Sequence, residues 1–356
     1  MGIFRWLLLP TLVFVAAYFA GVGGVEDKID HARTMGMALK TLFGFKQKDF
    51  DDMLGSYDVF DTPKGDASDE AKVNAVYKVL VPLMALGSLT KYYIPPLMDP
   101  TKNSFKYLNH NQVLFEHKMA DTIGVKSGQV ALDIGCGSGY IADTVQEHTG
   151  AKIVGINVSP EQIATARAHA ERSGKLGKGL LDFHVASMND PLSFEDNSFD
   201  AVYVMQAICY VHDPNALMKE VRRVLKPGGV FSDLSIVTLD NYDPQNQTQH
   251  RMMKNAQRVG VVTTFRPRTV YEDACTSNGF TLKTSKLLGA ADMTQAATDY
   301  FTPLGTLIQF FNKIGLMSKS VMESMDRMNE YAQDLVQGER EELFSINYWL
   351  VCQAPQ

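Results

Sequence analysis

The chain has 356 residues, of which 45% are hydrophobic and 21% are charged. This composition is typical of a globular protein with a hydrophobic core and excludes an intrinsically disordered chain. The formal net charge of −6 gives the protein no general attraction for a phosphate backbone, so nucleic acid is not expected as a partner.

The N-terminal segment differs from the rest of the chain because residues 6–25, WLLLPTLVFVAAYFAGVGGV, contain no charge. About 20 apolar residues are enough for a transmembrane helix. A cleaved signal peptide is the alternative, but AYFA is a poor cleavage site. We therefore predict an uncleaved transmembrane anchor over residues 1–25. The basic residues that follow it, Lys28, Arg33 and Lys40, outweigh Arg5, which favours a cytosolic position for the large domain.

Residues 26–109 are predicted to form a linker and a lid region. DTPKGDASDE, residues 61–70, is rich in turn-forming residues and predicts a surface loop. VYKVLVPLMALGSL, residues 76–89, is apolar but too short to span a membrane, and Pro82 interrupts it. This stretch is either a broken core helix or a lid or membrane-facing wall of a pocket. A further helix is predicted from about Asn111 to Ile123.

From Gln129 onward, short apolar strands alternate with amphipathic helices. The alternation predicts an α/β protein with a Rossmann-like, doubly wound parallel sheet. Ser159 and Pro160 suit the N-cap and first position of one helix, and Gly150 suits the end of another. Beyond Thr238 the alternation weakens, although 296–340 is predicted to be mostly helical and FSINYWLVCQA to be a last strand. The five strands predicted before that point are 130–134, 152–158, 181–187, 199–208 and 229–238.

The four cysteines lie far apart in the sequence and form no Cys-x-x-Cys pair. This spacing indicates neither a zinc site nor a disulfide framework, and no other metal site is expected. We therefore expect four reduced thiols, as in a cytosolic protein. The cysteines are Cys136, Cys209, Cys275 and Cys352.

The stretch ALDIGCGSGY places three glycines directly after the first predicted strand. Gly135, Gly137 and Gly139 allow a tight turn and a close approach of the backbone to a ligand. Their spacing lacks the wider second gap of a dinucleotide site, and the absence of GK[ST] excludes a P-loop. Asp133 lies two residues before the first glycine, where its carboxylate is predicted to hold a cationic ligand electrostatically.

This arrangement resembles motif I of the class I S-adenosylmethionine-dependent methyltransferases. FEDNSFDAVYVMQA resembles that family's acidic turn into strand four, and VRRVLKPGGVF resembles its turn into strand five. The resemblance implies a methyltransferase sheet over residues 110–240 with S-adenosylmethionine as the cofactor. It places the methionine part at the glycine turn, the ribose at Asn157, and the adenine near Ser187 and Met188.

The usual acids are missing from the ribose and adenine positions, and Asp190 is a candidate substitute. The neutral residue at the ribose position and the Gln that follows it occur in the lipid-modifying branch of the family. The cofactor-binding residues that the resemblance implies are Asp133, Gly135, Cys136, Gly137, Gly139, Asn157, Gln162, Ser187, Met188 and Gln206.

Residues 241–356 indicate which branch of the methyltransferase family the chain resembles. The stretch 315–355 resembles the end of sterol 24-C-methyltransferases, and 256–280 resembles the segment before it. MQAICYVHDP, residues 205–214, occupies the place of the family's substrate-side signature, but Gln206 stands where the sterol enzymes carry a Glu. The acids of an N-terminal signature, thought to steady a cationic intermediate, are replaced by Pro82 and Ala85. These departures weaken the expectation of a sterol alkene as substrate.

Methyl transfer requires an acceptor aligned with the S–CH₃ bond and a site without water. An alkene acceptor also requires a base that removes a proton afterwards. The predicted catalytic residues are Gln206, Tyr210 and His212, and His110 is a further candidate base. Each candidate base also has a structural alternative: His212 in a helix cap, Tyr210 in wall packing and His110 at the surface.

Three functions follow as hypotheses. The first is a membrane-anchored methyltransferase that acts on carbon of a sterol or related isoprenoid lipid. The second is a methyltransferase on another lipophilic acceptor, such as a quinol, a tocopherol-like phenol or a phospholipid headgroup amine. The third is a non-catalytic membrane scaffold. The expected partners are a lipophilic substrate and a membrane, and a homo-oligomer is compatible with the sequence. The family favours a single-pass protein of the endoplasmic reticulum with its catalytic domain in the cytosol.

Overall fold

A computed structural model gives the fold of residues 46–86, 89–289, 292–296 and 331–356. The predicted anchor over residues 1–25 and most of the predicted helical stretch 296–340 lie outside these residues. Within the described part of the chain, no helix combines the length and the apolar character needed to cross a bilayer.

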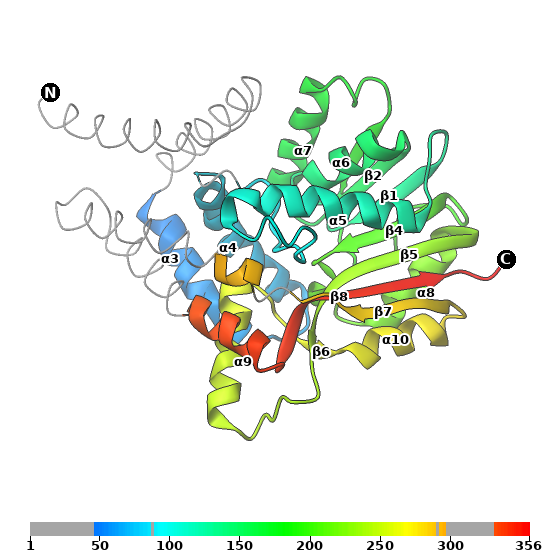
Figure 1. Cartoon of the computed structure of the whole chain (residues 1–356). Helices are drawn as coiled ribbons and strands as arrows, with labels where there is room; N and C mark the ends of the chain where they lie inside the picture. The colour runs from blue at the N-terminus through cyan, green and yellow to red at the C-terminus, as the bar shows by residue number, and fades with distance from the viewer. Residues whose placement is uncertain (1–45, 87–88, 290–291, 297–330) are drawn as a thin grey trace, which may run out of the picture.

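The fold is centred on a sheet that has eight strands within the described residues (Figure 1). The strand order is β3-β2-β1-β4-β5-β8-β7, and β6 pairs with β5. β1 to β5 run parallel, whereas β8 is antiparallel to both β5 and β7. The strands are β1 Val130–Ile134, β2 Lys152–Asn157, β3 Leu181–Val185, β4 Phe199–Met205, β5 Leu225–Thr238, β6 Arg266–Pro267, β7 Thr281–Leu287 and β8 Phe344–Gln353.

This topology confirms the predicted α/β class and Rossmann-like sheet. The last predicted strand is present as β8, and the five predicted parallel strands correspond to β1 to β5. β7 was not predicted, because its residues are largely exposed and its sequence, TLKTSKL, has little apolar character. It is specified by pairing with β8 rather than by its own burial.

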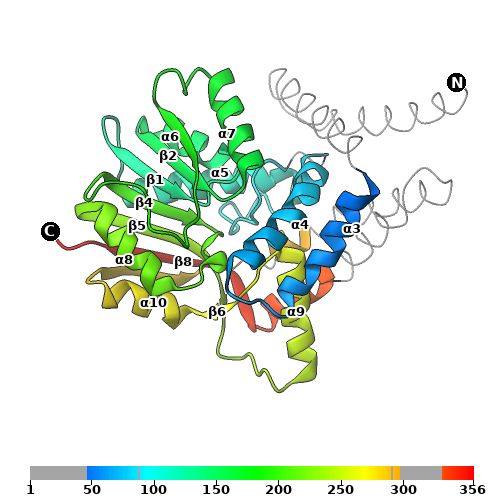
Figure 2. The same cartoon turned by 180° about the vertical axis from the view of Figure 1, so that it is seen from behind.

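Helices cover both faces of the sheet (Figures 1 and 2). α5, α6 and α7 pack on the face that carries Ala131 and Tyr203. α8 and α10 pack on the opposite face, which carries Leu132 and Val204, as the alternation of side chains along a strand requires. The labelled helices are α3 Gln47–Gly55, η1 Ser56–Phe60, α4 Ala67–Leu86, η2 Phe105–Tyr107, α5 Leu108–Ile123, α6 Tyr140–Thr149, α7 Pro160–Arg172, η3 Ile208–Tyr210, α8 Pro214–Val224, α9 Gln247–Gly260 and α10 Arg268–Ser277. Residues 292–296 and 331–340 are helical as well.

The predicted ends of two helices are confirmed. The Ser159 side chain accepts a hydrogen bond from the backbone N–H of Gln162, and Pro160 is the first residue of α7. Gly150 ends α6 in the left-handed conformation, with φ of 69°. These local signals fix how each helix enters and leaves the sheet.

α3, α4 and α9 gather beside one end of the sheet (Figures 1 and 2). α4 is one continuous helix through Pro82, so the predicted break is absent; Pro82 lies near the end of the helix. The predicted loop over 61–70 is also shorter, because α4 already begins at Ala67. The Ser68 N–H donates to Asp66 and the Gly65 N–H donates to Asp69, which starts the helix at this acidic turn.

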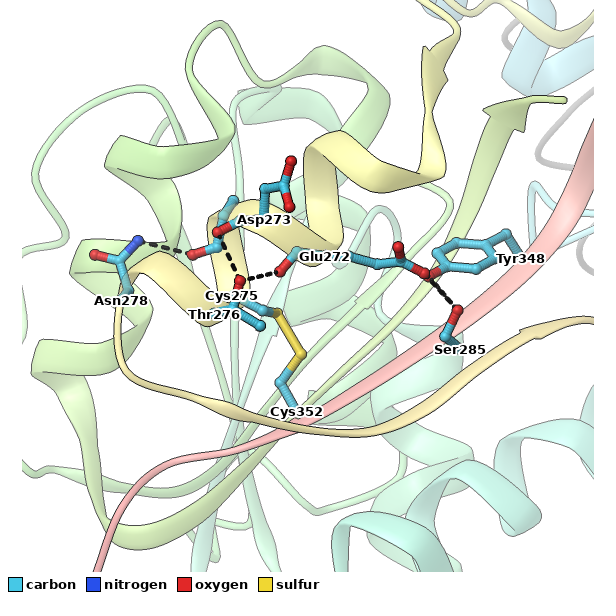
Figure 3. Close-up of a disulfide and its surroundings, with 9 residues drawn as sticks. Glu272, Asp273, Cys275, Thr276, Asn278, Ser285, Tyr348 and Cys352 are labelled. Atoms are coloured by element: carbon cyan, nitrogen blue, oxygen red, sulfur yellow. Dashed lines mark hydrogen bonds between the residues drawn. A yellow bond between two sulfur atoms is a disulfide. The ribbon is translucent and has the colours of Figure 1, made fainter. Parts of the chain in front are cut away.

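A disulfide between Cys275 of α10 and Cys352 of β8 contradicts the expectation of four reduced thiols (Figure 3). The two residues are 77 positions apart in the sequence, and their Cα atoms are 6.6 Å apart. Sequence spacing gave no sign of the pair because only the packing of α10 on the sheet brings it together. Cys136 and Cys209 are free and buried.

Candidate active site

A cavity of about 330 Å³ lies where the parallel strands end. One wall consists of the turns that follow β1, β2, β3 and β4, and the opposite wall consists of one face of α4. In open parallel sheets, ligands bind outside the carboxyl ends of the strands. The cavity therefore has the position of a ligand site, with α4 as its cover.

The glycine turn after β1 forms one end of the cavity. Gly135 has φ of 78°, and a Cβ atom there would lie 2.4 Å from the Cβ of Ala207. Gly137 has φ of 55°, and a Cβ atom there would lie 3.6 Å from Gln162 Oε1. The backbone N–H groups of Gly135 and Cys136 both donate to the carbonyl of Ile156, which ties the turn to β2. Bare backbone therefore faces the cavity here. Gly139 instead packs against Phe183 and does not line it.

Asp133 lies behind the glycine turn and does not line the cavity. Its side chain is 1% exposed, and its Oδ2 has no hydrogen-bond partner among the described residues. Burial raises the pKa of Asp133 to about 8, while the neighbouring Tyr203 hydroxyl partly opposes the shift. The carboxyl group is thus mostly neutral at pH 7, and its orphaned oxygen can accept a hydrogen bond from a donor that enters beside it.

The residues predicted for the ribose and adenine line the cavity at the next two strand ends. The Asn157 side-chain N–H donates to Gln162 Oε1 over 2.6 Å, so this amide pair forms one unit after β2. Ser187 and Met188 follow β3, and Met188 lies beside Gly135. Asp190, the candidate substitute acid, does not line the cavity.

Gln206 lines the cavity with a backbone conformation that is uncommon for its residue type. Its φ is 51°, in the left-handed region, and such outliers persist where surrounding structure holds them. Its Nε2 donates to the carbonyl of Ile346 over 2.6 Å and to Asn347 Oδ1 over 3.1 Å. The side-chain nitrogen of Gln206 thus links the turn after β4 to β8.

Tyr210 lines the cavity next to Tyr77 of α4, and their hydroxyl oxygens are 2.9 Å apart. Tyr210 donates to the carbonyl of Val261, so the proton between the two phenols belongs to Tyr77. Burial raises the pKa of Tyr77 to about 12 and holds the pKa of Tyr210 well above its ordinary value. Both phenols are therefore neutral, and neither is a phenolate base at pH 7.

Tyr77, Tyr92 and Tyr210 form an aromatic wall. The Tyr77 ring centroid is 6.5 Å from that of Tyr92 and 6.5 Å from that of Tyr210. Tyr92 is presented to the cavity by its neighbours, because Lys91 and Tyr93 both bond to the buried carboxylate of Glu116. Aromatic faces attract positive charge.

His212 also lines the cavity. Its backbone N–H donates to Asn189, while the neighbouring Asp213, not His212, caps α8. His110 lies elsewhere, next to Lys102 and Asp99, and does not line the cavity. Of the predicted candidate bases, the structure thus brings together Tyr210 and His212.

Residues 76–89 were offered as one wall of a pocket, and Tyr77 of this stretch does line the cavity, but the contribution of the earlier part of α4 was not predicted. Asp69, Glu70, Val73, Asn74 and Tyr77 all line it from this helix. No local motif marks these residues, and Glu70 bonds to a residue 117 positions away. The available signal was indirect: acids were missing from the strand ends where the resemblance led us to expect them.

Two families of known sequences match the chain. The family described as Methyltransferase domain matches residues 132–232, which include the glycine turn and β5 up to Ser232. The family described as sterol methyltransferase C-terminal matches residues 293–356.

Individual relatives extend the similarity beyond these segments. A sterol 24-C-methyltransferase of Aspergillus fumigatus is 31% identical over 270 residues, which cover 68% of this chain and 70% of the relative. Squalene methyltransferase 1 of Botryococcus braunii is 28% identical over 258 residues, which cover 69% and 67% respectively.

Solved structures share the fold at lower identity. The cyclopropane synthase MmaA2 from Mycobacterium tuberculosis has a TM-score of 0.59 at 18% identity and covers 74% of this chain and 90% of its own. A geranyl diphosphate C-methyltransferase from Streptomyces coelicolor, solved with S-adenosyl-L-homocysteine, has a TM-score of 0.55 at 17% identity and covers 74% and 91%. Together with the glycine turn and its cavity, these findings show that the chain belongs to the sterol methyltransferase family of class I S-adenosylmethionine-dependent methyltransferases.

Proposed function

We propose that this methyltransferase transfers a methyl group to a carbon atom of a sterol or a related isoprenoid lipid. The relatives that support the proposal are named for sterols and for squalene. The observation that carries it is the cavity, whose lining combines the backbone of the glycine turn with the aromatic wall of Tyr77, Tyr92 and Tyr210.

The residues at the glycine turn fit S-adenosylmethionine. A Cβ atom at Gly135 would collide with Ala207, so only glycine lets the turn after β1 pack this closely on the turn after β4. The orphaned Oδ2 of Asp133 can accept a hydrogen bond at the same turn. We propose that Gly135, Cys136 and Gly137 hold the methionine part, and that Asn157 with Gln162 holds the ribose. When bound, the cofactor supplies an electrophilic methyl group on a sulfonium.

The chain then has three tasks: to orient the acceptor, to exclude water and to tolerate positive charge. α4 closes the cavity opposite the glycine turn, which keeps water from the reacting carbon. The neutral rings of Tyr77, Tyr92 and Tyr210 stabilise positive charge that develops on an alkene acceptor. This arrangement replaces the missing acids with aromatic faces and does not require a carboxylate at Gln206.

His212 is the candidate to take the proton that an alkene acceptor must lose. It lines the cavity, and histidine is the side chain that most often serves as a general base. Tyr210 is unsuited because burial holds its pKa well above the ordinary value. Cys209 is unsuited as well, because burial raises its pKa to about 12.

A second candidate function is methylation of another lipophilic acceptor, such as a quinol, a tocopherol-like phenol or a phospholipid headgroup amine. The presence of Gln206 in place of an acid favours it. Incubating the enzyme with a lipid extract and methyl-labelled S-adenosylmethionine separates the two functions. Label in a new carbon branch supports the first function, and label on oxygen or nitrogen supports the second.

We also propose that residues 6–25 anchor the enzyme as a single-pass protein of the endoplasmic reticulum, with the catalytic domain in the cytosol. The uncharged apolar run and the basic residues after it support this orientation. The Cys275–Cys352 disulfide is the observation against it, because disulfides persist in oxidising compartments. Alkaline extraction of membranes tests the anchor, since the full chain stays in the pellet and a chain without residues 1–25 does not. Protease protection of sealed vesicles tests the orientation, and light scattering of purified protein decides whether a homo-oligomer forms.

A further inference from the structure

The strand ends that face the cavity lack acids, but an acid reaches the same place from α4. Ser187 follows β3 and Asn157 ends β2, and both side chains are neutral. Glu70 of α4 lines the cavity and accepts a hydrogen bond from Ser187 Oγ over 2.8 Å. A residue from a distant part of the chain thus places a carboxylate beyond the end of β3.

Glu70 is held in one orientation by a second donor. The side-chain N–H of Asn189 donates to the same Oε1 atom over 2.7 Å. Asn189 is itself fixed, because its Oδ1 accepts from the backbone N–H of His212 over 2.7 Å. The carboxylate is therefore joined, through one amide, to the segment that carries the catalytic candidates. Such bonding to neighbouring side chains keeps a binding group in place before the ligand arrives.

The other carboxylate oxygen of Glu70, Oε2, can still accept hydrogen bonds. Both donors, Ser187 and Asn189, bond to Oε1, and within the described residues Oε2 of Glu70 receives no hydrogen bond. A carboxylate accepts about four hydrogen bonds and donates none. It suits a ligand that presents an N–H group at this end of the cavity.

The order of the strands indicates which part of the cofactor would present an N–H group to Glu70. β1, β2 and β3 are successive neighbours in the sheet, and each contributes its carboxyl end to the cavity. Glycine backbone follows β1, the Asn157–Gln162 amide pair follows β2, and Glu70 meets Ser187 after β3. A molecule that lies across these ends with its methionine part at β1 brings its ribose to β2 and its adenine to β3.

We propose that Glu70 accepts a hydrogen bond from the exocyclic amine of adenine, in place of the acid that position 187 lacks. The inference rests on the assignment of this cavity to S-adenosylmethionine. It makes the N-terminal segment 46–86 part of the cofactor site rather than a cover for the lipid alone. Cofactor binding then stabilises the contact between α4 and the β3 end of the sheet.

Calorimetric titration with S-adenosylhomocysteine tests the contact without turnover. Glu70→Gln, which keeps the size of the side chain, is expected to bind about 10-fold more weakly, the scale of a hydrogen bond to a charged group. Glu171→Gln, an exposed position on α7, is the matched control and is expected to bind like the wild type. Equal affinity of Glu70→Gln and wild type would overturn the inference.

An analogue identifies the atom that Glu70 contacts. S-inosylhomocysteine carries a carbonyl oxygen where adenine carries its amine, so a carboxylate acceptor repels it. The wild type is expected to prefer S-adenosylhomocysteine by about 10-fold or more, and Glu70→Gln is expected to lose most of this preference. Because the preference is a ratio within one variant, a lower folded fraction does not alter it. A Glu70→Gln variant that keeps the full preference would refute the contact with adenine.

A double variant, Glu70→Gln with Ser187→Asp, returns a carboxylate to the end of β3. It is expected to recover the preference for adenine, which a purely structural role of Glu70 would not predict. A double variant that shows no preference would contradict the position of the contact. If the wild type itself gives no heat with S-adenosylhomocysteine, the proposed function fails first, and this inference fails with it.

Discussion

The two walls of the cavity are encoded in different ways. The wall at the strand ends is made of short turns, each specified by residues next to it in the sequence, such as Gly135 and Gly137. The wall opposite is one face of α4, and its residues reach the site only when the helix packs on the core. The residues of the first wall belong to sequence motifs of the family, whereas no local motif predicts the residues of the second wall. We infer that the first wall binds the methionine and ribose parts of the cofactor, whereas the second wall supplies Glu70 for the adenine and an aromatic ring for the substrate chemistry.

The largest expected effect comes from the glycine wall. Gly135→Ala adds a Cβ atom that would lie 2.4 Å from Ala207 at a φ of 78°. The turn must shift, and a displacement of about 1 Å at a binding group costs about 100-fold in function. We expect calorimetry with S-adenosylhomocysteine to show a loss of affinity on that scale.

Gly174→Ala is the matched control for this variant. Its φ is 68°, but nothing lies within 4 Å of the added Cβ atom. It therefore has the same backbone strain, about 1–2 kcal/mol, without the collision. If Gly135→Ala and Gly174→Ala lost the same affinity, backbone strain alone would control binding, and the collision with Ala207 would not matter.

The next effect tests the aromatic wall. Tyr77→Leu removes a ring that faces the cavity, so kcat for an alkene acceptor is expected to fall about 10-fold, the scale of a cation–π contact. Tyr77→Phe keeps the ring and loses only the hydroxyl bond to Tyr210, so kcat is expected to stay within about threefold. The affinity for S-adenosylhomocysteine is expected to stay unchanged in both variants. A Tyr77→Phe variant as slow as Tyr77→Leu would assign the effect to the hydroxyl rather than to the ring.

Reduction of the disulfide affects stability rather than chemistry. The Cys275–Cys352 bond lies on the side of the sheet that carries α10, and neither residue lines the cavity (Figure 3). Closing a loop between positions 77 residues apart stabilises the fold by about 2–4 kcal/mol. We expect a reducing agent to lower the Tm of the wild type. The double variant Cys275→Ala, Cys352→Ala should have a lower Tm that reductant does not change; a wild-type Tm insensitive to reductant would count against the bond.

A smaller, pH-dependent effect tests Asp133. Burial raises its pKa to about 8, so the folded state binds a proton that the unfolded state releases above pH of about 4. Its contribution to stability is fully present below that pH and is lost as pH rises toward 8. Asp133→Asn stays neutral, so the free energy of unfolding of the wild type is expected to fall relative to that of Asp133→Asn by about 3–4 kcal/mol between pH 5 and pH 8.

The exposed Asp240→Asn serves as the control for Asp133→Asn and is expected to show no such change. Denaturant unfolding at the two pH values measures both differences. A constant difference between Asp133→Asn and wild type would mean that Asp133 is ionised throughout this range.

Much of the fold was predictable because its signals are local. Ser159 and Pro160 mark the start of α7, and Gly150 marks the end of α6. The alternation of strands and helices predicted the parallel part of the sheet for the same reason. β7 was missed because its stability comes from pairing with β8, and the continuity of α4 was missed because Pro82 was treated as a break.

The residues of the site show the same difference between local signals and tertiary contacts. The residues of the strand-end turns were found from the sequence, and most of them line the cavity, although Asp133 and Gly139 lie behind it. Glu70 was not found, and Tyr77 was found only as part of a candidate pocket wall, because their roles arise from contacts 117 and 133 positions away. The Cys275–Cys352 pair was missed for the same physical reason: tertiary packing decides which distant residues meet.

The most direct test of the account is the fate of the methyl group itself. Purified enzyme is incubated with S-adenosylmethionine that carries a trideuterated methyl group, together with a sterol alkene or squalene, and the lipids are analysed by mass spectrometry and NMR. The account predicts deuterium in a new branch on carbon, with activity lost in Gly135→Ala and retained in Gly174→Ala. Deuterium found only on oxygen or nitrogen of other lipids, or no labelled lipid from enzyme that binds the cofactor, would contradict it.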